Sequence, residues 1–251
     1  MKKLFNYLFL LILISSCKQN EYSLTNFEGH QIEVSESVAS KKTYDSVLKP
    51  YRNHVEEQLS ENLAYNVREM KRTDGPLNSS IGNMMADAVM ELANPVFKAR
   101  TQKNIDFVLL NFGGIRAPMG QGEVSRRTAF EIMPFENEVV VLELSPKKIQ
   151  EMLEYLATES LAHPVSGIEI HLKSNNEVSA VKIQAKPLDT SKNYFVATSD
   201  YLKNGGDRMY FFENAINEIA LDYKMRNLFI DYFIKTDTIN YLPDNRFIKS
   251  N

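Results

Sequence analysis

Cysteine is nearly absent from this 251-residue chain, in which Cys17 is the only one. A single cysteine excludes an intramolecular disulfide. The chain has 43% apolar and 24% charged residues instead. This composition and length are sufficient to bury one good core, so we expect one large domain.

An excess of positive charge is also missing. The 29 lysines and arginines are outnumbered by 32 aspartates and glutamates, which gives a net charge of −3. Such a balance provides no general attraction for a polyanion, so nucleic-acid binding is not expected. Any anionic ligand must be held by a few cations placed in a pocket.

Histidines and catalytic motifs are sparse as well. The four histidines, His30, His54, His163 and His171, are scattered along the sequence, and His171 lies on a predicted strand. We interpret each as a surface or packing residue, not as a metal ligand. The sequence contains no serine-histidine-aspartate order, nucleophile elbow or phosphate P-loop that would supply another chemistry.

The N-terminus carries a targeting pattern. Two lysines precede an apolar run, Leu4 to Ile14, that is too short to span a bilayer comfortably, which predicts a signal peptide over residues 1–16. The following Ser15-Ser16-Cys17 completes a segment that resembles the bacterial lipobox, in which the cysteine is acylated. An ordinary signal peptide with an incidental cysteine is the alternative.

Diacylation at Cys17 would give a stable lipid anchor and leave the folded part soluble. Residues 17–40 are then a polar tether and residues 41–251 the domain. We expect the protein in a bacterial cell envelope, on the periplasmic or the cell-surface face, with membrane contact through the lipid alone.

Hydrophobic periodicity and capping residues predict the secondary structure. Helices are expected over residues 43–71 as one or two segments, 81–92, 125–133, from 145 onward, and 225–234. Strands are expected over residues 106–111, 138–144, 167–172, 178–183 and 194–198. Because helices and hairpin-like strands alternate without a strict βαβ order, the fold class is α+β.

Three separated segments carry a family resemblance. Asn111–Arg116 resembles an N-x-G-G-I-R loop, Gly122–Val124 followed by Pro134–Asn137 resembles a G-x-I block with a P-F-x-N turn, and Asp200–Asp207 resembles an aromatic-L-x-x-G-G-D loop. In this order they are similar to the C-terminal domain of the 5'-nucleotidase and UDP-sugar hydrolase family. Supporting matches are Gly82-Asn83, Asp87-Ala88, Asp231-Tyr232, Pro243 and Arg246.

The resemblance implies a layered mixed α/β domain that recognises a nucleotide. Phe135 and Tyr201 would stack on the two faces of the base, an interaction worth about 1–3 kcal/mol per base. The alternative is that both rings belong to the core, as most of the 14 Phe and 12 Tyr residues must. Tyr201 stands where the family commonly has phenylalanine, and it adds a hydroxyl.

The same resemblance assigns the sugar and phosphate. Asp207 would accept hydrogen bonds from two ribose hydroxyls, and Gly205 and Gly206 would allow close backbone approach. Arg116 would bind the phosphate or the ribose. The alternatives are a turn residue for Asp207 and a surface arginine for Arg116.

The sequence does not decide the roles of some other positions. Asn111 and Asn137 serve the base edge or brace the loops, and Arg72 is a further candidate cation without an assigned role. Glu136 stands where many members have glycine, and it places a carboxylate beside the expected base site.

Full-length members of the family hydrolyse phosphoesters with an N-terminal domain that holds two metal ions, and its ligand motifs are missing from this sequence. We therefore expect no catalytic residues, no metal site and no cofactor in this chain, and no efficient hydrolysis by it alone. Divalent metals are expected only in a partner metallophosphoesterase.

Three functions remain. The resemblance implies first that the chain would be the substrate-binding half of a 5'-nucleotidase, acting in nucleotide catabolism with a separately encoded metallophosphoesterase. Alternatively it would be a stand-alone nucleotide- or nucleoside-binding lipoprotein, or a surface lipoprotein that keeps the fold for adhesion.

Overall fold

The computed structural model describes residues 26–35, 37–38 and 42–250. The predicted signal peptide and the lipidated Cys17 lie outside these residues. The chain divides into two units, residues 1–48 and 49–251, and the second contains the sheets. Within the described part of the chain, no helix combines the length and apolarity that crossing a bilayer requires.

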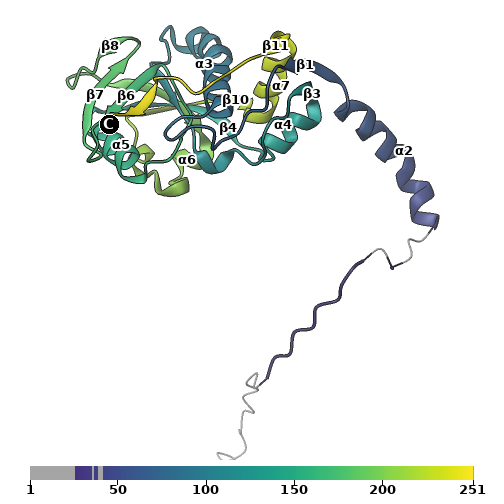
Figure 1. The fold of residues 1–251 in the computed structure, drawn as a ribbon. Helices are drawn as coiled ribbons and strands as arrows, with labels where there is room; N and C mark the ends of the chain where they lie inside the picture. Colours follow the sequence, from purple (N-terminus) through teal and green to yellow (C-terminus); the bar gives the residue numbers. More distant parts are fainter. Residues whose placement is uncertain (1–25, 36, 39–41, 251) are drawn as a thin grey trace, which may run out of the picture. The chain divides into compact units, whose positions relative to one another are not determined.

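A five-stranded mixed sheet forms the centre of the second unit (Figure 1). Its order is β10 (Asn217–Lys224), β4 (Glu138–Leu144), β9 (Tyr194–Ser199), β2 (Phe107–Leu109) and β5 (Val165–Ser166). β4 is antiparallel to both of its neighbours, whereas β2 is parallel to β9. The loops that follow β2 and β9 therefore leave the same end of the sheet as the loop that precedes β4.

Both faces of this sheet are buried. Val139 and Val141 point into one apolar cluster together with residues of α3 (Ser80–Thr101). Val140 and Leu142 point into the other cluster, which includes the apolar stripe of α5 (Pro146–Glu159). Because alternate residues of a strand face opposite sides, the continuous apolar run of β4 fits a strand covered twice. This layering confirms the expected mixed α/β domain.

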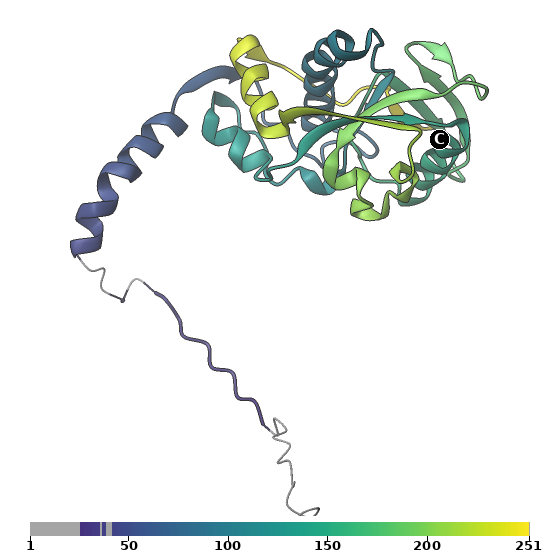
Figure 2. The same cartoon turned by 180° about the vertical axis from the view of Figure 1, so that it is seen from behind.

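Two smaller sheets flank the central one (Figure 2). The first joins β11 (Thr238–Ile239), β1 (Asn62–Asn66) and β3 (Gly122–Ser125), next to α4 (Arg126–Ile132) and α7 (Met225–Lys235). The second joins β12 (Phe247–Lys249), β6 (Ile168–Leu172), β7 (Val178–Ile183) and β8 (Lys186–Pro187). The predicted β6–β7 hairpin is therefore confirmed.

One predicted helical region is partly wrong. Helix α2 spans Lys42–Leu59, but the helix-like spacing continues into residues 62–66, which form strand β1. β1 pairs with both β3 and β11, so pairing with remote segments overrides the local apolar spacing. Ser79 caps α3 by accepting the Gly82 N–H, and α3 continues to Thr101, beyond the predicted end.

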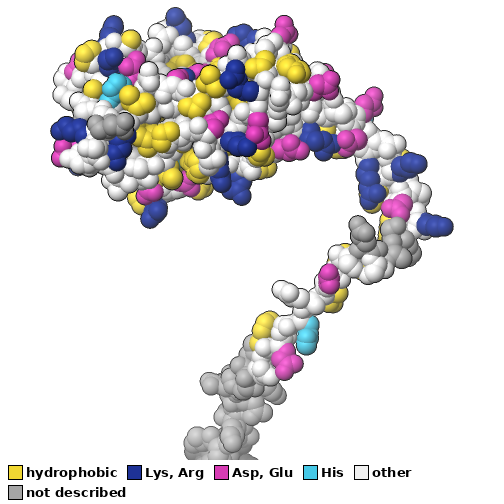
Figure 3. Space-filling model, viewed as in Figure 1, with side chains coloured by type: hydrophobic (Ala, Val, Ile, Leu, Met, Phe, Trp, Pro, Cys, Tyr) yellow, Lys and Arg dark blue, Asp and Glu magenta, His cyan; other side chains and the backbone are white. Residues whose placement is uncertain are grey.

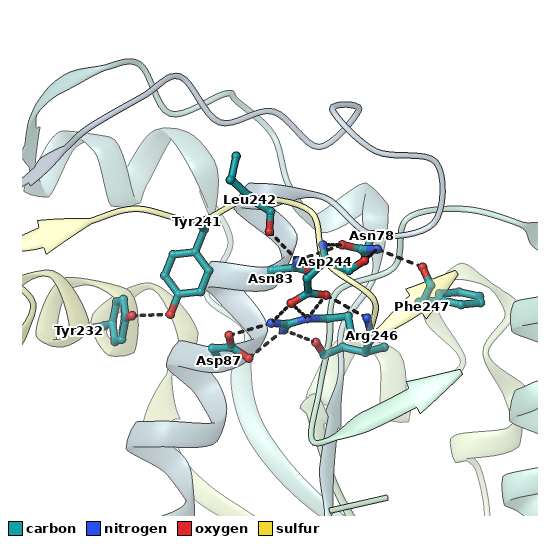
Figure 4. Close-up of polar contacts among 10 residues, drawn as sticks. Asn78, Asn83, Asp87, Tyr232, Tyr241, Leu242, Asp244, Arg246 and Phe247 are labelled. Carbon is teal, nitrogen blue, oxygen red and sulfur yellow. Dashed lines mark hydrogen bonds and ion pairs between the residues drawn. The ribbon is translucent and has the colours of Figure 1, made fainter. Parts of the chain in front are cut away.

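Arg246 holds the C-terminal segment against α3 (Figure 4). Its guanidinium donates to Asp87 at 2.8 and 3.1 Å, to Asp244 at 2.8 to 3.0 Å, and to the Val165 carbonyl at 2.8 Å. Burial lowers the pKa of Arg246, but its two carboxylate partners outweigh that effect and raise it. We call Asp87, Asp244 and Arg246 the Arg246 cluster.

Two neighbouring contacts extend this arrangement. The Asn83 side chain donates to the Asn78 side chain at 3.0 Å and to the Leu242 carbonyl at 3.1 Å, and the Tyr232 and Tyr241 hydroxyls are 2.8 Å apart. The supporting family matches thus have a structural role, because each takes part in a contact with residues 241–246. They are Asn83, Asp87, Tyr232 and Arg246.

Candidate functional site

The Phe135 turn, residues Pro134–Asn137, and the loop that begins at Asp200 share an anchor. Val139 of β4 pairs with Ser199 of β9, so the two loops leave the sheet next to each other. One oxygen of Asp200 accepts the Glu138 N–H at 3.1 Å and the Tyr201 N–H at 2.8 Å. This carboxylate therefore ties the end of the Phe135 turn to the backbone of Tyr201.

The loop after β2 meets Asp207 directly. The Asn111 side chain donates to Asp207 Oδ2 at 2.7 Å, at the start of the short 3-10 helix η1 (Phe112–Gly114). A Cβ on Gly113 would lie 3.3 Å from Asp207 Oδ2, and one on Gly114 would lie 2.7 Å from Asn111 Oδ1. The paired glycines thus permit this approach, and Asn111 braces the two loops.

Asp207 lies in a loop with unusual backbone angles. Gly205, Asp207 and Arg208 have φ values of 81°, 51° and 60°, all in the left-handed region. The side chain of Tyr155 on α5 supports this loop by donating to the Asp207 carbonyl at 2.9 Å. Left-handed conformations at side-chain-bearing residues cost free energy and concentrate at functional sites.

Tyr201 lies across this loop. Its hydroxyl donates to Asp207 Oδ1 at 2.8 Å, and this hydrogen bond raises the pKa of Tyr201. A Cβ on Gly206 would lie 2.5 Å from a carbon of the Tyr201 ring, so glycine is required where the ring crosses the backbone. Both oxygens of Asp207 thus accept one neutral donor each, and each oxygen retains further acceptor capacity.

The two rings assigned to the base are half-exposed. Phe135 is 38% exposed and Tyr201 is 44% exposed. Neither ring belongs to the two apolar core clusters of the described residues, so the core alternative does not apply. Arg116 lies between the loops: its guanidinium is 5.8 Å from the Phe135 ring centroid, and it donates to the Gly113 carbonyl at 3.4 Å.

Arg116 also lines a pocket of about 250 Å³ with Lys71 and Arg72. The Arg72 guanidinium donates to the Ile115 carbonyl at 3.0 Å and lies 4.6 Å from the Phe112 ring centroid. Two guanidinium groups on one pocket fit an anionic ligand. On the face of the molecule seen in Figure 3, cationic and anionic side chains are interspersed.

The carboxylate of Glu136 is paired and is not an isolated charge beside the site. It forms an ion pair with Arg226, whose hydrogen bond and charge lower the pKa of Glu136. The remaining candidate, Asn137, contributes its backbone: its carbonyl accepts the Met225 N–H at 2.9 Å.

His163, predicted as a surface or packing residue, supports the loop that follows β2, a role that the sequence did not predict. It is buried, and its Nδ1 accepts the Phe112 N–H at 3.2 Å, while its Nε2 has no hydrogen-bond partner. Burial lowers the pKa of His163 to about 4, so the ring is neutral at pH 7. Tyr155 and Arg226 were missed as well, because they lie outside the three motifs.

The described residues contain no group of three or more histidine, cysteine, aspartate or glutamate side chains placed to hold a metal ion.

The fold and the three loops define the class of protein: the chain belongs to the family of the 5'-nucleotidase C-terminal domain, which matches residues 57–214. This confirms the resemblance expected from the motifs. The chain is 29% identical over 215 residues to the trifunctional nucleotide phosphoesterase YfkN of Bacillus subtilis, which covers 78% of the chain and 14% of the relative. It is 27% identical over 233 residues to a cell wall protein of Listeria monocytogenes. This match covers 84% of the chain and 28% of the relative.

A solved structure agrees with this assignment. The 5'-nucleotidase precursor from Thermus thermophilus matches with a TM-score of 0.69 and 21% identity, over 84% of this chain and 43% of that chain. The chain thus spans less than half the length of these relatives.

Proposed function

We propose that this chain binds a nucleotide or nucleoside as the substrate-recognition half of a 5'-nucleotidase. The proposal depends most on one observation, the convergence of Asn111, Tyr201 and Gly113 on the Asp207 carboxylate. A carboxylate held by neutral donors retains acceptor sites for the two hydroxyls of a ribose. The exposed Phe135 and Tyr201 rings provide apolar faces for a base.

Arg116 and Arg72 are the proposed contacts for a phosphate group. Their pocket lies beside the loop that carries Asn111, and guanidinium groups bind phosphate oxygens through paired hydrogen bonds. Adenosine and AMP therefore distinguish the two parts of the site, because adenosine lacks the phosphate.

We further propose that a separately encoded metallophosphoesterase performs the hydrolysis. Its divalent metals would activate the attacking water, and this chain would present the nucleotide. The family match to a C-terminal domain supports this division of labour. A lipid anchor on Cys17 would place the pair at the cell envelope, in keeping with the cell wall relative.

Isothermal titration calorimetry with AMP tests the binding function. We expect saturable binding by the mature protein that is weakened by Phe135→Ala and by Asp207→Ala, and unchanged affinity in both variants would exclude this site. Addition of the protein to a metallophosphoesterase encoded by a neighbouring gene should raise AMP hydrolysis.

A stand-alone receptor is the second candidate, favoured by a recognition site formed within one chain. It predicts the same calorimetric binding without any gain in the hydrolysis rate of an added phosphoesterase.

A further inference from the structure

The Phe135 turn is held from outside the site by the start of helix α7. Three successive carbonyls of the turn accept hydrogen bonds from three successive residues: Phe135 O from Arg226 Nη1 at 3.4 Å, Glu136 O from Lys224 Nζ at 3.0 Å, and Asn137 O from the Met225 N–H at 2.9 Å. The turn itself belongs to no helix or strand. Its conformation therefore depends on these contacts.

Arg226 is the centre of this arrangement. Its side chain is nearly buried, and its guanidinium lies 4.1 Å from the ring centroid of Phe130 on α4. It also pairs with the exposed carboxylate of Glu136. A guanidinium fixed by an aromatic face on one side and a carboxylate on the other presents its donors in one orientation.

We propose that Arg226 is a positioning residue that sets the orientation of the Phe135 ring, and through it the recognition of the base. This inference rests on the proposed nucleotide-binding function. Arg226 is engaged by Phe130, Glu136 and the Phe135 carbonyl, so it acts on the ligand through the turn and not by contact. Its loss affects the base, whereas Asp207 is held by Asn111 and Arg116 is held by the Gly113 carbonyl, both outside the Phe135 turn, so the ribose and phosphate contacts persist.

The test compares two ligands, AMP and ribose 5-phosphate, which differ by the base. Arg226→Met keeps the apolar contact with Phe130 but removes every donor. We expect it to weaken AMP binding about 10-fold, within the range of one stacking interaction, and to leave ribose 5-phosphate binding unchanged. Arg127→Met is the matched control, since Arg127 forms an exposed ion pair with Glu56, and it should change neither affinity.

Two further variants make the result decisive. Glu136→Ala alters an exposed side chain without threatening the fold, and it should produce a smaller loss that is again restricted to AMP. In a Phe135→Ala background, Arg226→Met should have no further effect on AMP, because the ring on which it acts is gone.

The outcomes separate this inference from the proposed function. If the unmodified protein does not bind AMP, both are wrong. If it binds AMP but Arg226→Met leaves AMP unaffected, or weakens both ligands equally, only the positioning role is wrong.

Discussion

The Arg246 cluster and the surroundings of Asp207 are both built from family residues far apart in the sequence, yet they differ in how completely their charges are paired. Arg246 is surrounded by two carboxylates and a carbonyl that use its guanidinium donors. Asp207 receives one amide and one hydroxyl hydrogen bond, and the described part of the chain places no ion-pair partner on it.

This difference distinguishes a structural cluster from the proposed binding site. A charge paired within the protein has little to offer a ligand, and removing its partner destabilises the fold because an uncompensated charge is left behind. A charge held in place by neutral donors contributes less to stability but remains able to bind.

Removal of Arg246 should cost the most stability. Arg246→Met leaves Asp87 and Asp244 together without their cation, so we expect the free energy of unfolding to fall by about 3 kcal/mol. Urea denaturation measures this change. Asp207→Asn, which breaks no ion pair, serves as the comparison and should cost less than about 1 kcal/mol; equal losses would remove the contrast.

Acidification should weaken the fold through His163. Burial lowers its pKa in the folded protein from 6.5 to about 4. The unfolded chain therefore takes up the proton first, and stability falls as the pH drops from about 6.5 to about 4. At about 1.4 kcal/mol per pKa unit, the full loss is on the order of 3 kcal/mol.

His163→Asn is the control for this pH dependence, because its amide oxygen can accept the Phe112 N–H but does not titrate. Urea denaturation at several pH values should show a smaller acid loss in this variant than in the unmodified protein. Identical pH profiles would assign the acid sensitivity to other groups.

Neutralising Asp207 should act on binding instead of stability. A hydrogen bond to a charged group is worth about 1.5–3 kcal/mol, so Asp207→Asn should weaken AMP binding about 10-fold or more. The preference for AMP over 2'-deoxy-AMP should shrink in parallel, because the carboxylate is proposed to accept the ribose hydroxyls. Calorimetry with both ligands measures this, and an unchanged preference would place the ribose elsewhere.

Tyr201→Phe should give the smallest change. It keeps the ring but removes the hydrogen bond to Asp207, so one carboxylate oxygen is released for the ligand. We expect AMP affinity to rise about twofold and stability to fall by about 0.5 kcal/mol, the low end for a hydrogen bond of a half-exposed side chain. Weaker binding would instead show that the hydroxyl assists the ligand.

The sequence predicted those parts of the fold whose determinants are local. Strand β4 and the start of α5 at Ser145-Pro146 follow from apolar patterning and capping within a few residues. Strand β1 was read as helix because its pairing with β3 and β11 is remote.

The contacts of the candidate site also join residues that are remote in sequence, and local patterns do not predict such contacts. The motifs located Asn111 and Asp207 but not the hydrogen bond between them. The supporting residues His163 and Arg226 carry no local pattern, because each is defined by a neighbour more than 50 residues away in sequence.

The place of AMP on the protein can be seen in a crystal structure of the protein soaked with AMP. We predict density for the base against Phe135 and Tyr201, with the ribose hydroxyls on Asp207 and the phosphate toward Arg116. AMP bound at another place, or no AMP bound at saturating concentration, would contradict the account.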